Sequence, residues 1–364
     1  MLEKEKLAVL SLWAIPGIGP QSLVRLGNYC EGAFKTLLGL PLQDWLPAAP
    51  LNDSVKARFQ RYSSLDQLGN SLLESTERLQ MEIAFKGDAG YPEVLSKISD
   101  APPLIFFRGV IGASRPRLAM VGSRHPEQGF IPFARSFSKR ISESGAGIIS
   151  GAAQGVDSAC HRGALDARSE TWAFLGSSLD MLDRFHQNLE HDCLSYGGMF
   201  FSELPPGTAA TRYTFPRRNR LISGASDAVL VLRAAEKSGT LHTAEAALKQ
   251  KKPLFALPGD PRNQSAKGCN DLIARGSASA CSGVEQMVEA LGLKLTETPS
   301  LPIAGEDLSV SARAAYCALP STPQPFEKVK SATQMDTDGL ISALCELEVY
   351  GLVVQHPGKY YEKI

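Results

Sequence analysis

The chain has 364 residues, of which 43% are apolar and 21% charged, and its 38 basic and 38 acidic side chains give a formal net charge of zero. This length allows two or three domains, and the composition is that of a folded globular protein rather than a disordered one. A neutral chain is not basic over its whole surface, but it can still hold a local anion site. No apolar run approaches the ~20 residues that cross a bilayer, so no membrane span is expected.

The seven cysteines are widely scattered, without a CxxC motif or a Cys/His cluster. Such a distribution is typical of a reduced, cytoplasmic protein and argues against a zinc site. Residues 1–17 carry acidic side chains near the start and no small-residue cleavage site after their apolar run, so they do not resemble a signal peptide. We therefore expect a cytoplasmic protein.

Residues 1–80 read as a domain of short amphipathic helices separated by Pro and Gly. The sequence IPGIGP, at Ile15–Pro20, lies between two of the predicted helices. A Gly-rich turn of this kind can present backbone N–H groups to a phosphate, as in helix-hairpin-helix modules, or it can simply be a tight structural turn.

Residues 81–293 follow a different pattern, in which short apolar runs alternate with helical stretches. Unalternating runs of Val, Ile, Leu, Phe and Ala indicate strands that are buried on both faces, and their alternation with helices predicts a parallel α/β sheet. The predicted strands lie at about 117–122, 146–150, 171–176, 199–203, 227–232 and 253–259.

A Pro- and Thr-containing linker is predicted at 294–306, followed by a small domain at 307–364. Helices at about 309–319, 326–334 and 336–351 and a hairpin at 352–363 describe a winged helix. The third helix lacks Lys and Arg and carries four acidic residues, which does not suit a phosphate-lined groove. We predict that this domain contacts protein rather than DNA. The acidic residues are Asp336, Asp338, Glu346 and Glu348.

Three predicted strands end in loops of small residues, and in a parallel sheet such ends meet at one edge, where ligands bind. Together they favour a phosphate or nucleotide pocket over three unrelated turns. None of the loops matches GxGxxG or the P-loop motif, so neither a dinucleotide nor ATP, nor any other cofactor, is predicted. The loop residues are Gly122, Ser123 and Arg124; Ser150, Gly151 and Gly155; and Ser238, Gly239 and Thr240.

The stretch RYTFPRRNRLISG, Arg212–Gly224, contains four arginines. Pro216 suits the first turn of a helix, which places Arg217, Arg218 and Arg220 near a helix N-terminus, where cations oppose the macrodipole. A bound anion would reverse this cost, and nearby aromatic rings could stack on unpaired bases. The alternative is an internal knot that joins the arginines to buried carboxylates such as Glu203.

Two further features have structural and functional interpretations. Asp157 and His161 stand four residues apart on one helix, and we favour a hydrogen bond between them over an acid–base pair. Lys267, Gly268 and Asn270 mark a helix start after a strand. They either help to close the same pocket or belong to a long ordered loop.

Five motifs follow one another along residues 85–290: VGSRHPEQG, GIISGAAQGVDSACHRGAL, FPRRNRLISGASDAVLVLRAAEKSGTLHTAEAAL, LFALPGD and KGCNDLIARG. In these motifs and their order the chain resembles the DNA-processing protein A family (DprA, also called Smf). The resemblance implies a Rossmann-like, mostly parallel sheet with an N-terminal helical (SAM-like) domain and a C-terminal winged helix. It also implies a cytoplasmic homodimer that binds single-stranded DNA, protects incoming strands in natural transformation and loads the RecA recombinase, without catalysing a reaction.

The family's strand-binding pocket corresponds here to Gly122, Ser123, Arg124, Ser150, Gly151, Arg217, Arg218, Asn219 and Arg220. We add Gln154, Gly155, Arg212, Phe215, Ser238, Gly239, Thr240 and Lys267 as DNA-binding candidates. Two departures from the family pattern stand out. Gln154 replaces a usually basic residue, and the segment from Asp180 to Asn188 lacks the family's Tyr-Pro and is one residue wider.

The enzyme alternative is a nucleotide hydrolase that resembles the LOG-type phosphoribohydrolases, whose motif is PGGxGTxxE. In this chain Thr243 occupies the position of the acid, and Glu245 lies two residues beyond it, which argues against glycosidic cleavage. A protein-interaction scaffold is a third hypothesis, which the arginine- and glycine-rich loops disfavour.

Overall fold

The computed structural model describes residues 3–88, 90–112, 115–127, 129–295, 308–320, 322–349 and 352–363. Its contacts divide the chain into two compact units, Met1–Thr296 and Glu297–Ile364. Nearly all of the predicted linker at 294–306 lies outside the described residues. The finer domain boundaries inferred from the sequence stay predictions.

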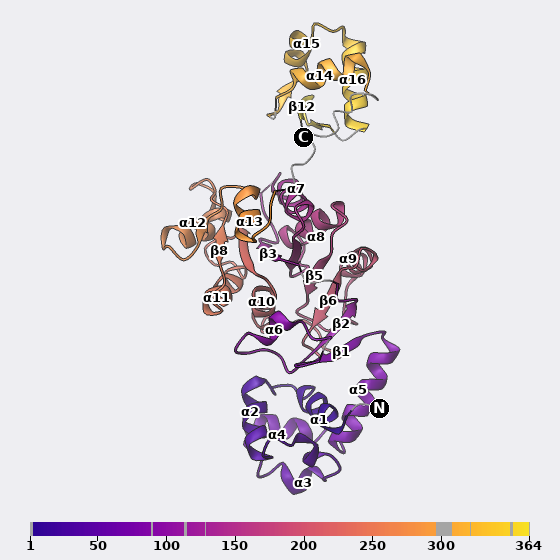
Figure 1. Ribbon diagram of the computed structural model, residues 1–364, viewed down its shortest axis with the longest axis vertical. Helices are drawn as coiled ribbons and strands as arrows, with labels where there is room; N and C mark the ends of the chain where they lie inside the picture. The colour runs from indigo at the N-terminus through magenta and orange to yellow at the C-terminus, as the bar shows by residue number, and fades with distance from the viewer. Residues whose placement is uncertain are drawn as a thin grey trace. The chain divides into compact units, whose positions relative to one another are not determined.

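The first unit begins with short helices, as the sequence predicts (Figure 1). Pro20 begins one of them, where its missing N–H costs nothing, and the side chains of Asn52 and Ser64 cap two others. Their buried apolar side chains form a core that also includes side chains of the strands β1 and β2, described below. The elements are α1 (Lys4–Trp13), α2 (Pro20–Tyr29), η1 (Phe34–Leu37), α3 (Leu42–Trp45), α4 (Asp53–Phe59) and α5 (Leu65–Arg78).

A nine-stranded sheet follows, in the order β1-β2-β6-β5-β4-β3-β7-β8-β9. The pairs from β6 through β9 are parallel, whereas β1 pairs antiparallel with β2, and β2 with β6. Every residue of β3 to β7 is buried, as the unbroken apolar runs predict. The strands are β1 (Glu82–Phe85), β2 (Leu104–Gly109), β3 (Arg117–Gly122), β4 (Gly147–Ser150), β5 (Thr171–Phe174), β6 (Met199–Ser202), β7 (Ala228–Arg233), β8 (Leu254–Ala256) and β9 (Ser279–Ala280).

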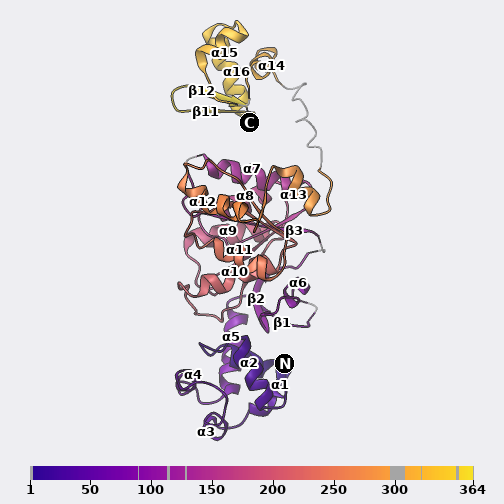
Figure 2. The same cartoon turned by 90° about the vertical axis from the view of Figure 1, so that its left-hand side faces the viewer.

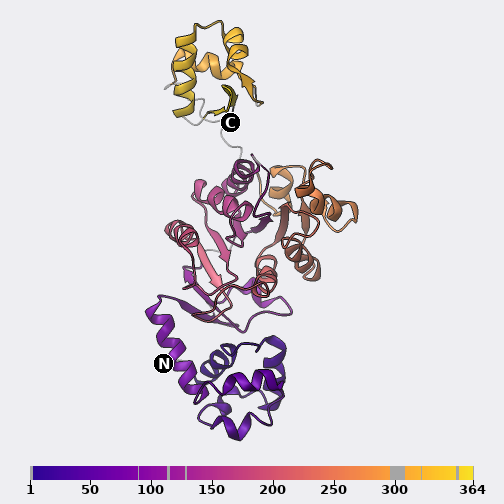
Figure 3. The same cartoon turned by 180° about the vertical axis from the view of Figure 1, so that it is seen from behind.

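Helices cover both faces of this sheet (Figure 3). One face carries α7 (Phe130–Glu143), α8 (Val156–Asp166) and α13 (Val284–Ala290), and α9 (Arg184–Ser195) packs beside α8. The other face, turned to the viewer in Figure 2, carries α10 (Thr214–Gly224), α11 (Leu241–Lys249) and α12 (Lys267–Ala274). The short α6 (Glu93–Ser96) packs against α10, and η2 (Gln264–Ala266) precedes α12. This arrangement is the predicted Rossmann-like α/β core.

The strand order reverses beside β3. From β3 the chain moves outward through β4 and β5 to β6, and then returns to place β7 on the opposite side of β3. The register of the β3–β7 pair shifts between Val121 and Gly122, at the carboxyl end of β3. In open parallel sheets this switch point is where loops diverge and leave room for a ligand.

The described residues of the second unit form three helices and a three-stranded antiparallel sheet ordered β10-β12-β11. Helices and hairpin agree with the predicted winged helix, whereas β10, which pairs with β12, was not predicted. Buried apolar side chains of all three helices share one core with β11 and β12. The elements are α14 (Val310–Ala318), β10 (Gln324–Pro325), α15 (Phe326–Thr333), α16 (Thr337–Val349), β11 (Val353–His356) and β12 (Tyr360–Lys363).

None of the described helices combines the length and the apolar character that a membrane span requires.

Candidate functional site

Two adjoining cavities lie at the carboxyl ends of the parallel strands. The first, of about 420 Å³, is lined by loops after β3, β4, β5 and β6 and the start of α10. The second, of about 470 Å³, is lined by the loops after β3, β4 and β7, the start of α8 and the same α10. Both are lined by Arg124, His125, Ala153, Phe215 and Arg218, so they are two lobes of one cleft. We call it the switch-point cleft, with a first and a second lobe.

Arg218 is the buried cation of this cleft, with 5% of its surface exposed. Its Nη1 donates to the carbonyl oxygen of Gly151 at 2.6 Å and to that of Phe174, and its Nε donates to Oδ1 of Asn219 at 3.0 Å. It forms no ion pair within 4.0 Å with any described carboxylate. Burial lowers the pKa of Arg218 to about 10, which still leaves it charged at neutral pH. The carboxylate of Asp157 opposes this lowering from beyond ion-pair distance, while the hydrogen bonds of Arg218 go to neutral oxygens. A buried cation without a direct carboxylate partner favours an anionic ligand.

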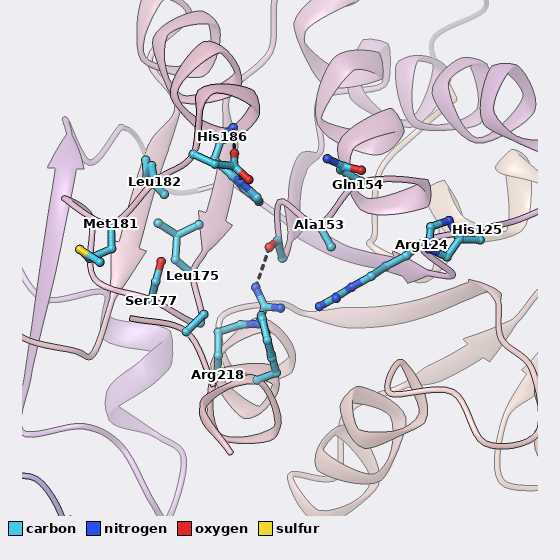
Figure 4. Close-up of a pocket in the computed structure, with 15 residues that line it drawn as sticks. Arg124, His125, Ala153, Gln154, Leu175, Ser177, Met181, Leu182, His186 and Arg218 are labelled. Atoms are coloured by element: carbon cyan, nitrogen blue, oxygen red, sulfur yellow. Dashed lines mark hydrogen bonds and ion pairs between the residues drawn. The ribbon is translucent and has the colours of Figure 1, made fainter. Parts of the chain in front are cut away.

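Arg124 supplies a second cation from the β3–α7 loop. Figure 4 shows its side chain reaching across the cavity toward Arg218. Both guanidinium groups lie over the ring of Phe215, at 4.9 Å for Arg124 and 5.9 Å for Arg218. Two like charges that converge on one aromatic ring repel each other, and Arg124 adds to the lowering of the Arg218 pKa. An anion between them would relieve this repulsion.

The carboxylate of Asp157, in the first turn of α8, lies against the two glycine loops at which a bound anion was expected. Its Oδ1 accepts from the backbone N–H of Gly122 at 3.1 Å and its Oδ2 from that of Gly151 at 3.2 Å. Burial raises the pKa of Asp157, against the opposing effects of Arg218 and the two N–H donors. Those two N–H groups therefore hold the protein's own carboxylate, and an external anion is left with the side chains and the remaining loops.

Gly155 is a loop glycine at which any other residue would be strained. Its φ is +94°, and an added Cβ would lie 2.5 Å from the carbonyl oxygen of Ser123 and 2.6 Å from that of Arg124. The residue joins the loops after β3 and β4 at the start of α8, where Val156 N–H donates to the Ser123 carbonyl at 3.1 Å. Its role is therefore to let these loops approach each other.

The second lobe collects the residues after β7. Ser238, Gly239 and Thr240 line it, together with Arg212. Nδ2 of Asn219 donates to the carbonyl of Gly239 at 3.3 Å, which ties this loop to α10. An added Cβ on Gly239 would meet nothing within 4 Å, so its absent side chain leaves open space on the wall of the lobe.

Arg217 and Arg220 leave the cleft and join a buried carboxylate instead. Nη2 of Arg220 lies 2.7 Å from Oε2 of Glu203, and Nε of Arg217 lies 3.4 Å from Oε1 of the same residue. Nε of Arg220 also pairs with Asp100 at 3.1 Å. The knot considered as the alternative therefore forms with these two arginines, while Arg212 and Arg218 line the cleft.

The remaining candidates divide in the same way. Gln154 lines the first lobe, and Gly122 and Ser123 line the second. Ser150 is fully buried and donates to the carbonyl of Met120 at 2.6 Å, so it ties neighbouring strands together. Lys267 begins α12, as predicted, but pairs with Glu236 at 2.7 Å and is absent from the lining of both lobes.

The structure also adds residues that sequence reasoning missed. His125 lines both lobes, and Met181, Leu182, Asp183 and His186 line the first. The last four lie in and after the loop that departs from the family pattern. The signal that could have found them is their position between a buried strand and the first turn of a helix that has Asp183 as its N-cap.

The predicted hydrogen bond between Asp157 and His161 is wrong. Asp157 bonds the two glycine loops, whereas Nδ1 of His161 lies 2.7 Å from Oγ1 of Thr171 on β5. His161 is fully buried, and burial lowers its pKa to about 3. Four-residue spacing placed both side chains on the sheet side of α8, where stronger backbone and strand partners were available.

No set of three or more His, Cys, Asp or Glu side chains that could hold a metal ion occurs among the described residues.

Comparison with known proteins identifies the family of this chain. The family model described as DNA recombination-mediator protein A matches residues 82–292. Protein Smf of Escherichia coli strain K12 is 34% identical over 281 residues, which are 74% of this chain and 74% of that protein.

Two solved structures are also similar. That of DNA processing protein A (DprA) from Streptococcus pneumoniae has a TM-score of 0.62 and 28% identity, and covers 79% of this chain and 98% of its own. The second is that of DNA processing protein A from Helicobacter pylori, which is described as giving insight into the unique single-stranded DNA binding mode of that protein. It has a TM-score of 0.52 and 26% identity, and covers 58% of this chain and 95% of its own.

Proposed function

Because the chain belongs to the DNA recombination-mediator protein A family, we propose that it binds single-stranded DNA in the switch-point cleft. The observation that carries the proposal is the convergence of Arg124 and the buried Arg218 on Phe215, with no ion pair within 4.0 Å between Arg218 and any described carboxylate. Phosphates would be held by the cations, and the ring offers an apolar surface to a base.

We expect fewer phosphate contacts than the sequence suggests. Arg124, Arg212 and Arg218 line the cleft, while Arg217 and Arg220 have a carboxylate partner in Glu203. Three phosphate contacts predict a salt slope of about −2 for single strands, rather than the value near −3 expected from four. Ser238, Thr240 and Gln154 would add uncharged hydrogen bonds.

We further propose that the protein protects incoming single strands and hands them to a RecA recombinase in natural transformation, as a cytoplasmic homodimer and without catalysing a reaction. The family's description as a recombination mediator supports this role. The acidic α16, with Asp338 and Glu346 among its residues, favours contact with a protein over contact with DNA in the second unit.

The hydrolase alternative lacks its acid. Thr243 lines the second lobe at the position where the LOG-type motif needs a carboxylate. The side chain of Glu245 is 63% exposed, pairs with His242 at 3.5 Å and does not line either lobe. Incubation with nucleoside monophosphates should therefore release no free base, and released base would favour the hydrolase.

The deciding experiment is a titration of the full chain with single- and double-stranded DNA of the same length over a range of salt. We expect tighter binding of the single strand and a slope of about −2. Equal affinity for both forms, or no binding, would contradict the proposal. Addition of a RecA protein to strands precoated with this protein tests the second part, with faster filament formation as the expected result.

A further inference from the structure

Helix α10 carries cations on two of its sides. Arg217 and Arg220, three residues apart, lie on one side and pair with Glu203, whereas Arg218 points to the other side and lines both lobes of the switch-point cleft. Side chains of one helix keep fixed angles to one another, because each residue turns the helix by about 100°. Whatever fixes the rotation of α10 on the side of Arg217 and Arg220 therefore also fixes the direction of Arg218.

Glu203, directly after β6, holds the side of α10 that lies outside the cleft. Its carboxylate is 2% exposed and lies 2.7 Å from Nη2 of Arg220 and 3.4 Å from Nε of Arg217. Buried ion pairs often add little net stability compared with apolar side chains of similar volume, and their best-attested use is to specify one arrangement. The contacts of Glu203 therefore suit the positioning of a helix.

The cleft side of α10 is where such positioning matters. Arg124 reaches across the cavity toward Arg218 (Figure 4), and the positive end of the α10 macrodipole lies close to the same guanidinium. Both repulsions favour a rotation of the helix that takes Arg218 out of the cleft. Such a rotation would also draw Arg217 and Arg220 away from Glu203, so these ion pairs oppose it.

Trp13, the last residue of α1, ties this arrangement to the N-terminal helices. Its side chain is buried, and its Nε1 donates to the backbone carbonyl of Glu203 at 2.7 Å. The guanidinium of Arg217 lies 5.7 Å over its ring. The indole thus contacts both the residue that holds α10 and α10 itself, and it fixes the backbone from which the Glu203 carboxylate projects.

We propose that Trp13 and Glu203 are positioning residues of the DNA site. Through them the N-terminal helices hold α10 in the rotation that directs Arg218 into the cleft before a strand arrives. The inference rests on the proposed function and deepens it, because it gives the helical domain a share in single-strand affinity although neither residue lines the cleft. A cation that is already in place costs less ordering on binding, and this raises affinity.

The test uses Trp13→Phe, which keeps an aromatic ring in the core and removes the N–H that Glu203 accepts. Well below its unfolding temperature, the full-length variant should bind single-stranded DNA about fivefold more weakly and with a salt slope of smaller magnitude, because Arg218 contributes less. Trp45→Phe is the matched control. Trp45 is 3% exposed in the same group of helices, and its Nε1 has no hydrogen-bond partner in the described chain, so affinity and slope should not change.

A double-mutant cycle at low salt identifies the route. In an Arg218→Ala background, Trp13→Phe should change the affinity by less than twofold, because the side chain that it positions is gone. Glu203→Gln should also weaken binding and show the same dependence on Arg218.

The outcomes separate the two proposals. Wild-type affinity in Trp13→Phe, an equal loss in Trp45→Phe, or the same fivefold loss with and without Arg218 would overturn the positioning role and leave the proposed function standing. So would weaker binding with an unchanged salt slope. Failure of the unaltered protein to bind single-stranded DNA would overturn the proposed function itself.

Discussion

The indole Nε1 of Trp13 donates a hydrogen bond of 2.7 Å to the backbone carbonyl of Glu203. The carboxylate of the same Glu203 holds Arg217 and Arg220, and the guanidinium of Arg217 lies 5.7 Å over the Trp13 ring. Glu203, which directly follows β6, therefore joins helix α1 to the arginine-rich helix α10. The arginines outside the cleft serve this junction.

Glu203→Gln should lower the free energy of unfolding by about 2–3 kcal/mol, because it leaves a nearly buried Arg220 with only the half-exposed Asp100 as an ion-pair partner. The Glu203 and Arg220 side chains are 2% and 11% exposed. Urea unfolding measures the change. Glu285→Gln, which breaks the exposed pair with Arg140, is the control and should cost less than about 1 kcal/mol. Equal effects of the two substitutions would mean that the junction contributes little.

Arg124→Ala should weaken single-strand binding about tenfold and reduce the magnitude of the salt slope by about 0.7, since one phosphate contact is lost. Unfolding should be nearly unchanged because Arg124 is exposed. Arg262→Ala removes a cation that is 90% exposed and outside both lobes, and should leave affinity and slope as they were. A similar loss in both variants would point to a diffuse effect of charge.

Gly155→Ala and Gly239→Ala should behave differently. Alanine at 155 must adopt a positive φ and displace two carbonyl oxygens, so we expect destabilisation of more than about 1 kcal/mol. Alanine at 239 meets no atom and should leave stability within about 0.5 kcal/mol. Reduced single-strand affinity in Gly239→Ala at unchanged stability would mark a close approach of the strand to this loop. Thermal unfolding and a binding titration of both variants are the measurements.

His161 should make the fold sensitive to acid. Its folded pKa of about 3 lies below the ordinary 6.5, so below pH 6.5 the unfolded chain takes up a proton that the folded chain refuses. Stability is therefore present above pH 6.5 and lost as the pH falls toward 3, by about 2 kcal/mol between pH 8 and pH 5. His161→Gln should flatten this part of the curve, whereas substitution of the exposed His191 should not. A wild-type pH dependence in His161→Gln would show that other groups control it.

Removal of residues 297–364 should leave single-strand affinity within about twofold, since the cleft belongs wholly to the first unit. The absence of Lys and Arg from α16 leads to the same expectation. Gel-shift titration of residues 1–296 against the full chain measures it. A loss of tenfold or more would assign part of the DNA site to the second unit.

The central sheet could be predicted because its strands are buried on both faces, so that runs such as AVLVL carry an unambiguous signal. The antiparallel strands β1 and β10 could not be predicted in this way. Strand β1 has only four residues, two of them not buried, and β10 has only two. Such short strands are defined by their partners across the sheet rather than by a local pattern.

The candidate site was predictable in its position and only partly in its residues. Strand ends and glycines located the cleft, but nothing local distinguishes Arg218, which turns into it, from Arg220, which turns toward Glu203. Two residues apart on a helix, these side chains point in different directions. Their partners come from β4, β5 and β6, and are known only once the sheet is assembled.

The carboxylate of Asp157 has a consequence for the kinetics of binding. Since it already organises the loops after β3 and β4, their conformational entropy is lost when the chain folds and not when a ligand arrives. Association should then proceed without a slow ordering phase, at a rate set by diffusion and charge. The heat-capacity change on binding should reflect only the surface that the DNA itself covers.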